Sequence, residues 1–167
     1  MKILSVREYP DGVVTEPGNR VVYDVARNEA FFGAARVGGH ALVWELAGEP
    51  GPGDWLLRCD RVDFPPGGVA YRHIHPGPGI RVLLKGRIRI ETEGGSHEYG
   101  PFESWYESGP DPVFAAASET EETAFVRVLL LPLEWAGKRT IRYLDPADEE
   151  KPKLQRATVF IEEPIRR

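Results

Sequence analysis

The chain alternates between apolar and polar residues over short stretches, which is the pattern of β-strands rather than helices. No stretch keeps apolar residues at helical spacing over three turns. Period-two or nearly continuous apolar runs predict strands at residues 21–25, 28–36, 41–46, 55–64, 80–91, 124–133 and 157–161. The run 124–133 is apolar except for Arg127, which is typical of a buried strand.

Glycine and proline clusters separate these runs and predict turns between strands. They lie at residues 48–53, 65–68, 76–79, 94–95 and 108–112. Residues 117–123, with Glu119, Glu121 and Glu122, predict a charged hairpin tip, and the acidic residues 145–150 a solvated loop. Short strands at this spacing indicate an antiparallel sandwich or barrel.

Length and charge narrow the class of protein further. The 167 residues fit one domain, 1–167, and the formal net charge of −5 argues against nucleic acid or an anionic membrane as the partner. The single cysteine, Cys59, excludes an intramolecular disulfide and a cysteine-rich zinc site, and we expect it to be a small buried apolar residue. No apolar stretch is long enough to span a membrane, so we expect a soluble, cytoplasmic protein.

His73-Ile74-His75 is the arrangement that carries the clearest chemistry. Side chains two residues apart on a strand point to the same side, so both imidazoles can reach one cation. A neutral imidazole nitrogen is a common ligand of divalent metals. The pair follows one turn cluster and precedes another, as expected at the end of a strand in a sheet.

The segment Gly67–Gly86 resembles the first motif of the cupin superfamily, which consists of a glycine, an H-x-H pair, a glutamate and a closing glycine. His73, His75 and Gly86 match, whereas the glutamate position is Gly79. The segment Tyr99–Val113 is similar to the second motif, but no histidine follows Gly109. The resemblance covers about residues 55–133.

The resemblance implies an all-β fold, a cupin-type β-barrel or double-stranded jelly-roll-like sandwich, often dimeric, with its site inside the barrel. We place the barrel core at about residues 53–133. An N-terminal arm, 1–52, and a C-terminal arm, 134–167, are expected to add strands to its sheets, with a homodimer interface as one role for the arms.

Two histidines alone bind a divalent metal too weakly, so a third ligand is needed. Glu107 is the first candidate, because it ends the strand of the second motif near the missing histidine. Asp111 is next, and His40 and His97 are weaker candidates. Two histidines and one carboxylate would suit Fe, Mn, Ni or Zn and leave positions open for substrate.

Arg81 is expected to share the interior face with position 79. It would either bind a substrate carboxylate or phosphate, or pair with an internal carboxylate such as Glu107. Tyr71 shares parity with the histidines, and Trp105 lies in the second-motif strand. Both are candidates for substrate binding, with a place in the core as the alternative.

These features leave three functions open, and the sequence does not decide whether the protein is an enzyme. The first is an enzyme that acts on a small organic acid in the barrel, either metal-dependent and of oxygenase or isomerase type, or with His73 as acid–base without a metal. The second is a metal-free module that binds or senses a small ligand. The third is a structural protein whose barrel is filled by side chains.

Overall fold

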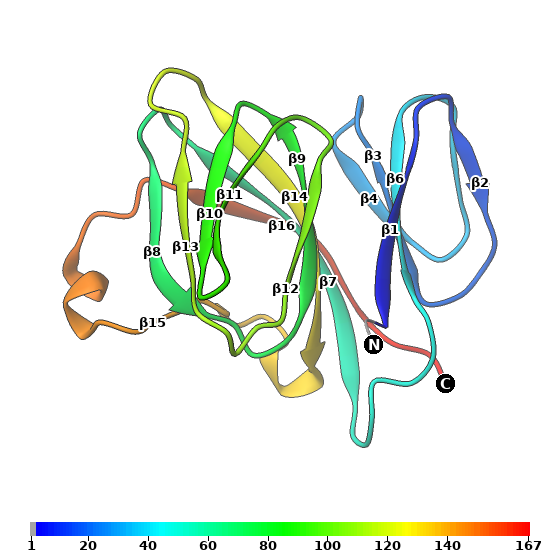
Figure 1. Cartoon of the computed structure of the whole chain (residues 1–167). Coiled ribbons are helices and arrows are strands. Elements are labelled where there is room, and N and C mark those ends of the chain that lie inside the picture. Colours follow the sequence, from blue (N-terminus) through cyan, green and yellow to red (C-terminus); the bar gives the residue numbers. More distant parts are fainter. Residues whose placement is uncertain (1–2) are drawn as a thin grey trace.

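The computed structural model describes residues 3–167, which fold into three β-layers (Figure 1). The N-terminal layer is a sheet of order β1-β6-β3-β4, covered on one face by the ribbon β2-β5. Its strands are β1 (Leu4–Tyr9), β2 (Val13–Thr15), β3 (Arg20–Asp24), β4 (Glu29–Phe32), β5 (Ala35–Val37) and β6 (Ala41–Leu46). The run predicted at 28–36 therefore forms two strands, because the chain turns at residues 33–34.

Two facing five-stranded sheets make up the barrel. The central sheet contains, in spatial order, β12 (Ser104–Glu107), β9 (Gly79–Lys85), β14 (Thr123–Pro132), β7 (Trp55–Phe64) and β16 (Arg156–Pro164). The outer sheet contains β11 (Gly95–Tyr99), β10 (Ile88–Thr92), β13 (Val113–Ala117), β8 (Val69–Ile74) and β15 (Arg142–Tyr143). The predicted all-β sandwich is thus confirmed.

The central sheet is buried on both faces, which explains the apolar run of β14. One face packs against the N-terminal sheet through Tyr23, Leu42 and Trp44, all fully or almost fully buried. Trp44 Nε1 also donates a hydrogen bond to the Ile80 carbonyl of β9 at 3.1 Å. Cys59 lies in this apolar layer, as predicted, and burial raises the pKa of its thiol well above the ordinary value.

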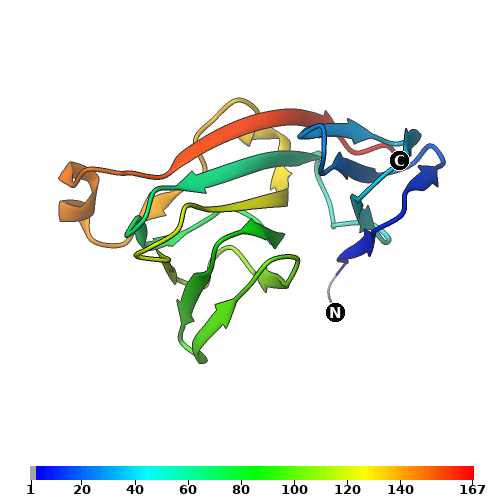
Figure 2. The same ribbon diagram turned by 90° about the horizontal axis from the view of Figure 1, so that it is seen from above.

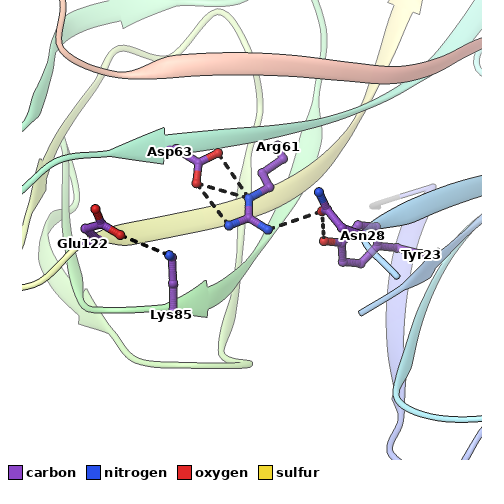
Figure 3. Close-up of polar contacts among 6 residues, drawn as sticks. All are labelled: Tyr23, Asn28, Arg61, Asp63, Lys85 and Glu122. Atoms are coloured by element: carbon purple, nitrogen blue, oxygen red, sulfur yellow. Dashed lines mark hydrogen bonds and ion pairs between the residues drawn. The ribbon is translucent and has the colours of Figure 1, made fainter. Parts of the chain in front are cut away.

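Polar contacts at the edge of this layer join the N-terminal sheet to the barrel (Figure 3). Arg61 of β7 binds Asp63 through both carboxylate oxygens and reaches Asn28 Oδ1 at 3.3 Å. The hydroxyl of Tyr23 donates to the same Asn28 oxygen. Residues 3–46 are therefore fixed to the barrel by polar as well as apolar contacts.

Over residues 3–52, the N-terminal arm does not extend the barrel sheets, contrary to the prediction, because its strands pair with one another in separate sheets. The C-terminal arm adds one strand to each barrel sheet, as predicted. β15 pairs with β8, and β16 pairs with β7 along most of its length. Figure 2 shows β16 crossing from the barrel to the N-terminal sheet. The dimer interface proposed for the arms stays a prediction.

The arm also contains two 3-10 helices, η1 (Leu133–Trp135) and η2 (Pro146–Glu150). The segment 145–150 is solvated as predicted, except for the buried Asp148. It forms η2 rather than a loop, because Asp145 caps it by accepting from the Ala147 N–H. Among residues 3–167, no helix has the length and apolar character needed to cross a membrane. The cytoplasmic location stays a prediction.

The single strand predicted at 80–91 is two strands, β9 and β10, separated by a turn at Gly86. Gly86 has φ +78°, and a Cβ atom there would lie 2.6 Å from the Glu122 carbonyl oxygen. A side chain at this position is therefore disfavoured both by the backbone conformation and by space.

We expect Gly86→Ala to lower the free energy of unfolding by about 1–3 kcal/mol from the backbone conformation alone. Urea unfolding followed by circular dichroism would measure the change. Gly94→Ala is the matched control, since Gly94 lies in a hairpin without positive φ and a Cβ there meets only Thr92 Oγ1 at 3.7 Å. Equal stability of the two variants would contradict the assignment of Gly86 as a required turn glycine.

Candidate functional site

His73 and His75 lie at the end of β8 and point between the two barrel sheets. Each is about 5% exposed, and the ring centroids are 4.9 Å apart with the ring planes nearly perpendicular. The prediction that both imidazoles face the barrel interior is confirmed.

Each of the two imidazoles is held through its Nδ1 atom. His73 Nδ1 lies 2.7 Å from the Tyr71 carbonyl oxygen, which can only accept, so Nδ1 carries the proton and Nε2 keeps its lone pair. His75 Nδ1 lies 3.1 Å from Thr140 Oγ1, while His75 Nε2 is buried without a hydrogen-bond partner. The Nδ1 contacts thus orient both rings, and the Nε2 atoms are available to bind a ligand.

Glu107 completes a three-residue cluster with the histidines. One ligand atom from each of His73, His75 and Glu107 lies within 4.8 Å of the others, and all three residues are buried. It is the one such cluster that residues 3–167 contain. The sequence prediction of Glu107 as the third candidate ligand agrees with this geometry.

Glu107 lies beside Gly79, the residue at the glutamate position of the motif that residues 67–86 resemble. Glu107 pairs directly with Gly79 across the β12–β9 ladder, so its carboxylate comes from the neighbouring strand. A Cβ atom at position 79 would lie 2.5 Å from Leu129 Cδ2, 2.7 Å from the Val128 carbonyl oxygen and 3.0 Å from Arg81 Nη1. Packing therefore excludes a side chain at 79, and Glu107 occupies the adjacent place.

Arg81 points into the same cavity, as predicted, and is only 1% exposed. Its Nη2 lies 3.0 Å from Glu107 Oε1, but the angle is not that of a hydrogen bond, and both Nη1 and Nη2 lack a hydrogen-bond partner. Burial lowers the pKa of Arg81 to about 10, which leaves the guanidinium charged at neutral pH. The predicted internal ion pair is present, and it leaves donor groups of the guanidinium unused.

Trp105 supports the other oxygen of Glu107. Its Nε1–H donates to Glu107 Oε2 at 2.8 Å, and its ring stacks on Tyr99 with centroids 4.8 Å apart. Trp105 also lines the cavity, so the prediction of a substrate contact remains compatible with its position.

Tyr71 does not line this cavity, contrary to the parity argument. The β8–β13 ladder pairs His73 with Val113 and Ala70 with Ala115, so Phe114 alone lies opposite Tyr71 and Arg72. This β-bulge shifts the alternation of β8 by one residue, and Ala70 rather than Tyr71 shares the interior face with His73. The Tyr71 ring instead lies 4.7 Å from Lys151 Nζ.

The other candidate ligands lie away from the cluster. His40 contacts Glu8 at 2.6 Å beside the N-terminal sheet, and His97 is exposed on β11. Asp111 is exposed and accepts a hydrogen bond from Ser108 Oγ. None of them contributes to the cavity that holds His73 and His75.

Sequence reasoning missed a row of charges on the central sheet beside Arg81. Arg127 of β14 pairs in register with Arg81 and with Asp60, and it binds the Asp60 carboxylate at 2.7 and 3.0 Å. Arg58, two residues from Asp60, binds Glu162 at 3.0 Å. The available signal was the interruption of two otherwise apolar strands by charged residues, but those of β7 fall on both parities, which hides the face that they occupy.

The cavity has a volume of about 610 Å³ and combines three kinds of lining. Its apolar end contains Val62, Phe64, Ala70, Ile90, Val113, Ala115 and Phe125. Its charged middle contains Arg58, Asp60, His73, His75, Arg81, Glu107 and Arg127. The C-terminal arm lines the remaining side with Lys138, Arg139, Thr140, Lys151 and Lys153, among others.

Burial keeps both histidines neutral at physiological pH. It lowers the pKa of His73 below the ordinary 6.5, although the nearby Glu107 charge acts in the opposite direction. Burial lowers the pKa of His75 further, and the charges of Arg127 and Arg81 act in the same direction. Neutral imidazoles are the forms that coordinate metals.

These shifts predict that the metal-free protein loses stability as the pH falls through about 6.5. The unfolded chain then binds protons at these histidines, whereas the folded state excludes them until a lower pH, so unfolding becomes more favourable. His75→Gln should weaken this dependence when urea unfolding is measured between pH 7.5 and 5.5 in the presence of a chelator. His97→Gln is the control, and an identical dependence in both variants would count against buried neutral histidines.

No protein-family model matches the chain, and no curated protein matches it. A cupin 2 conserved barrel domain protein from Leptotrichia buccalis is 16% identical over 76% of this chain and 82% of its own, with a TM-score of 0.46. A polyketide cyclase from Streptomyces resistomycificus is 17% identical over 81% of each chain, with a TM-score of 0.43. A sugar phosphate isomerase of the cupin superfamily from Silicibacter pomeroyi is 15% identical over 84% of this chain and 78% of its own, with a TM-score of 0.39.

The facing sheets, with the H-x-H pair at the end of β8 directed between them, are features of the chain itself. This arrangement is the one that the motif at Gly67–Gly86 predicts, and it gives the chain a cupin-type β-barrel fold.

Proposed function

We propose that the chain is a metal-dependent enzyme that acts on a small organic acid inside the barrel. The observation that carries this proposal is the convergence of His73, His75 and Glu107, whose ligand atoms lie within 4.8 Å of one another. The cluster lies in a cavity large enough for a small organic molecule.

The residues present fit a divalent metal. Two imidazoles and one carboxylate are a ligand set that binds Fe, Mn, Ni or Zn and leaves positions open for substrate. The Nδ1 contacts to the Tyr71 carbonyl and Thr140 hydroxyl resemble the outer contacts that orient metal-binding histidines. The unpartnered Nε2 of His75 is the buried atom that such a metal would satisfy.

A bound metal would supply Lewis-acid or redox chemistry at its open positions, as oxygenases and isomerases require. His73 and His75 would hold it, and Trp105 would fix the orientation of Glu107 through its hydrogen bond. Arg81 would bind the carboxylate of the acid, since its Nη atoms have no hydrogen-bond partner. The apolar end of the cavity would exclude water from the reacting part of the substrate.

A metal-free ligand-binding or sensor module is the second candidate. The observation that favours it is the ion pair of Arg81 with Glu107, because this contact occupies the carboxylate and brings positive charge to the histidines. A purely structural role is disfavoured, since the barrel encloses a cavity and Arg81 is not fully paired.

Metal binding separates the first two candidates. We expect tag-free protein, stripped with a chelator and dialysed against Fe, Mn, Ni or Zn, to retain one equivalent of at least one metal by elemental analysis. His73→Ala and Glu107→Gln should each weaken binding by more than about 100-fold, since each removes a ligand rather than an outer contact. His97→Ala should bind like wild type, and failure of wild type to bind any of the four metals would leave the metal-free module as the better account.

A further inference from the structure

The buried side-chain polar atoms that lack hydrogen-bond partners gather in the cavity. Within residues 3–167 they belong to Arg58, His75, Arg81 and Gln155, and all four residues line it. Arg58 Nε and both Nη atoms of Arg81 can only donate hydrogen bonds. What the cavity chiefly lacks is therefore an acceptor, and the partner that fits two guanidinium groups is an anion.

The charges of the lining agree with an anionic ligand. Cationic side chains outnumber acidic ones there: the former are Arg58, Arg81, Arg127, Lys138, Arg139, Lys151 and Lys153, and the latter Asp60, Glu107, Glu149 and Glu162. The whole chain, in contrast, has a formal net charge of −5. Positive charge is thus concentrated at the cavity, which attracts an anion.

The opposite end of the cavity indicates the remainder of the ligand. Phe64 and Phe125 lie next to one another there, with ring centroids 6.0 Å apart, and Ile90 and Val113 contribute further apolar surface. Since Phe125 is two residues from Arg127 on β14, the apolar end directly adjoins the charged middle. A ligand that contacts both has one anionic group and an apolar body.

The carboxylate of Glu107 has two possible partners, a bound metal and the Arg81 guanidinium. It is the carboxylate of the metal cluster, and its Oε1 lies 3.0 Å from Arg81 Nη2. Because this ion pair lacks hydrogen-bond geometry, a ligand carboxylate that binds the Nη atoms bidentately would make the better contact. Such a ligand would draw the guanidinium from Glu107 and leave the carboxylate to the metal.

We propose that the cavity binds a monocarboxylic acid with an apolar body, and that this acid and the metal bind cooperatively because the acid replaces Glu107 on Arg81. The inference rests on the proposed metal centre and adds the class of substrate and its coupling to the metal. Linkage requires the effect to be reciprocal, so the acid strengthens metal binding by the same factor as the metal strengthens acid binding.

The test uses benzoate as the acid and Zn²⁺ as the metal, with the full chain and calorimetric titration. We expect benzoate to strengthen Zn²⁺ binding by about 5-fold or more, as is usual for coupled sites. Benzamide, which has the same shape without the charge, should have no effect. Arg81→Met should bind Zn²⁺ more tightly than wild type without benzoate and should not respond to it, whereas Arg87→Met, at an exposed arginine, should behave like wild type.

A second variant tests the competition without metal. Glu107→Gln removes the carboxylate that competes for Arg81, so the metal-free variant should bind benzoate more tightly than metal-free wild type. This measurement also tests whether Glu107 and the acid compete for Arg81 if circular dichroism shows that Arg81→Met is unfolded. An unchanged or weaker benzoate affinity in Glu107→Gln would overturn the competition.

The outcomes distinguish this inference from the proposed function. Zn²⁺ binding that benzoate does not alter, or the absence of benzoate binding, would overturn the inference and leave the metal centre in place. No Zn²⁺ binding by wild type would overturn the cooperativity, and the comparison of wild type with Glu107→Gln would still show whether acid and Glu107 compete for Arg81.

Discussion

A guanidinium inside a protein keeps its charge and needs partners, and Arg81 lies almost completely buried between two β-sheets. Its nearest carboxylate, Glu107, is shared with two histidines and a tryptophan. The charged middle of the barrel is arranged around this incomplete pairing. Beside it on the same sheet, the partly buried Arg127 makes two hydrogen bonds to the Asp60 carboxylate, so its charge is fully paired.

The rest of the fold surrounds the charged middle of the cavity with apolar packing. The N-terminal sheet covers the outer face of the central sheet with apolar side chains. Arg58, Asp60, Arg81 and Arg127 face the cavity on the other side, while Arg61 contacts the N-terminal sheet at its edge. Two apolar clusters flank the charged middle. One contains Leu56, Leu129 and Leu131, and the other contains Phe64 and Phe125. Positive charge and apolar surface therefore meet inside one cavity, which is the combination that a carboxylic acid requires.

The strands at 41–46 and 55–64 and the inward direction of His73, His75 and Arg81 could be predicted because two-residue alternation determines them. Tyr71 could not be placed, because a bulge opposite Phe114 depends on the partner strand β13 and leaves no local pattern. Glu107 was selected for its place near the missing histidine of the second motif, yet it lies beside the missing glutamate at Gly79. That relation follows from the β12–β9 register, as do the contacts of Arg58, Asp60 and Arg127, and register between distant strands is not visible in one sequence.

An X-ray structure of crystals grown with Zn²⁺ and benzoate, with anomalous scattering recorded at the zinc edge, tests the metal centre and its coupling to the acid most directly. We expect one anomalous peak bound by His73, His75 and Glu107, and an Arg81 guanidinium that has left Glu107 for the benzoate carboxylate. A peak away from these three side chains, or benzoate bound while the Arg81–Glu107 contact persists, would contradict this expectation.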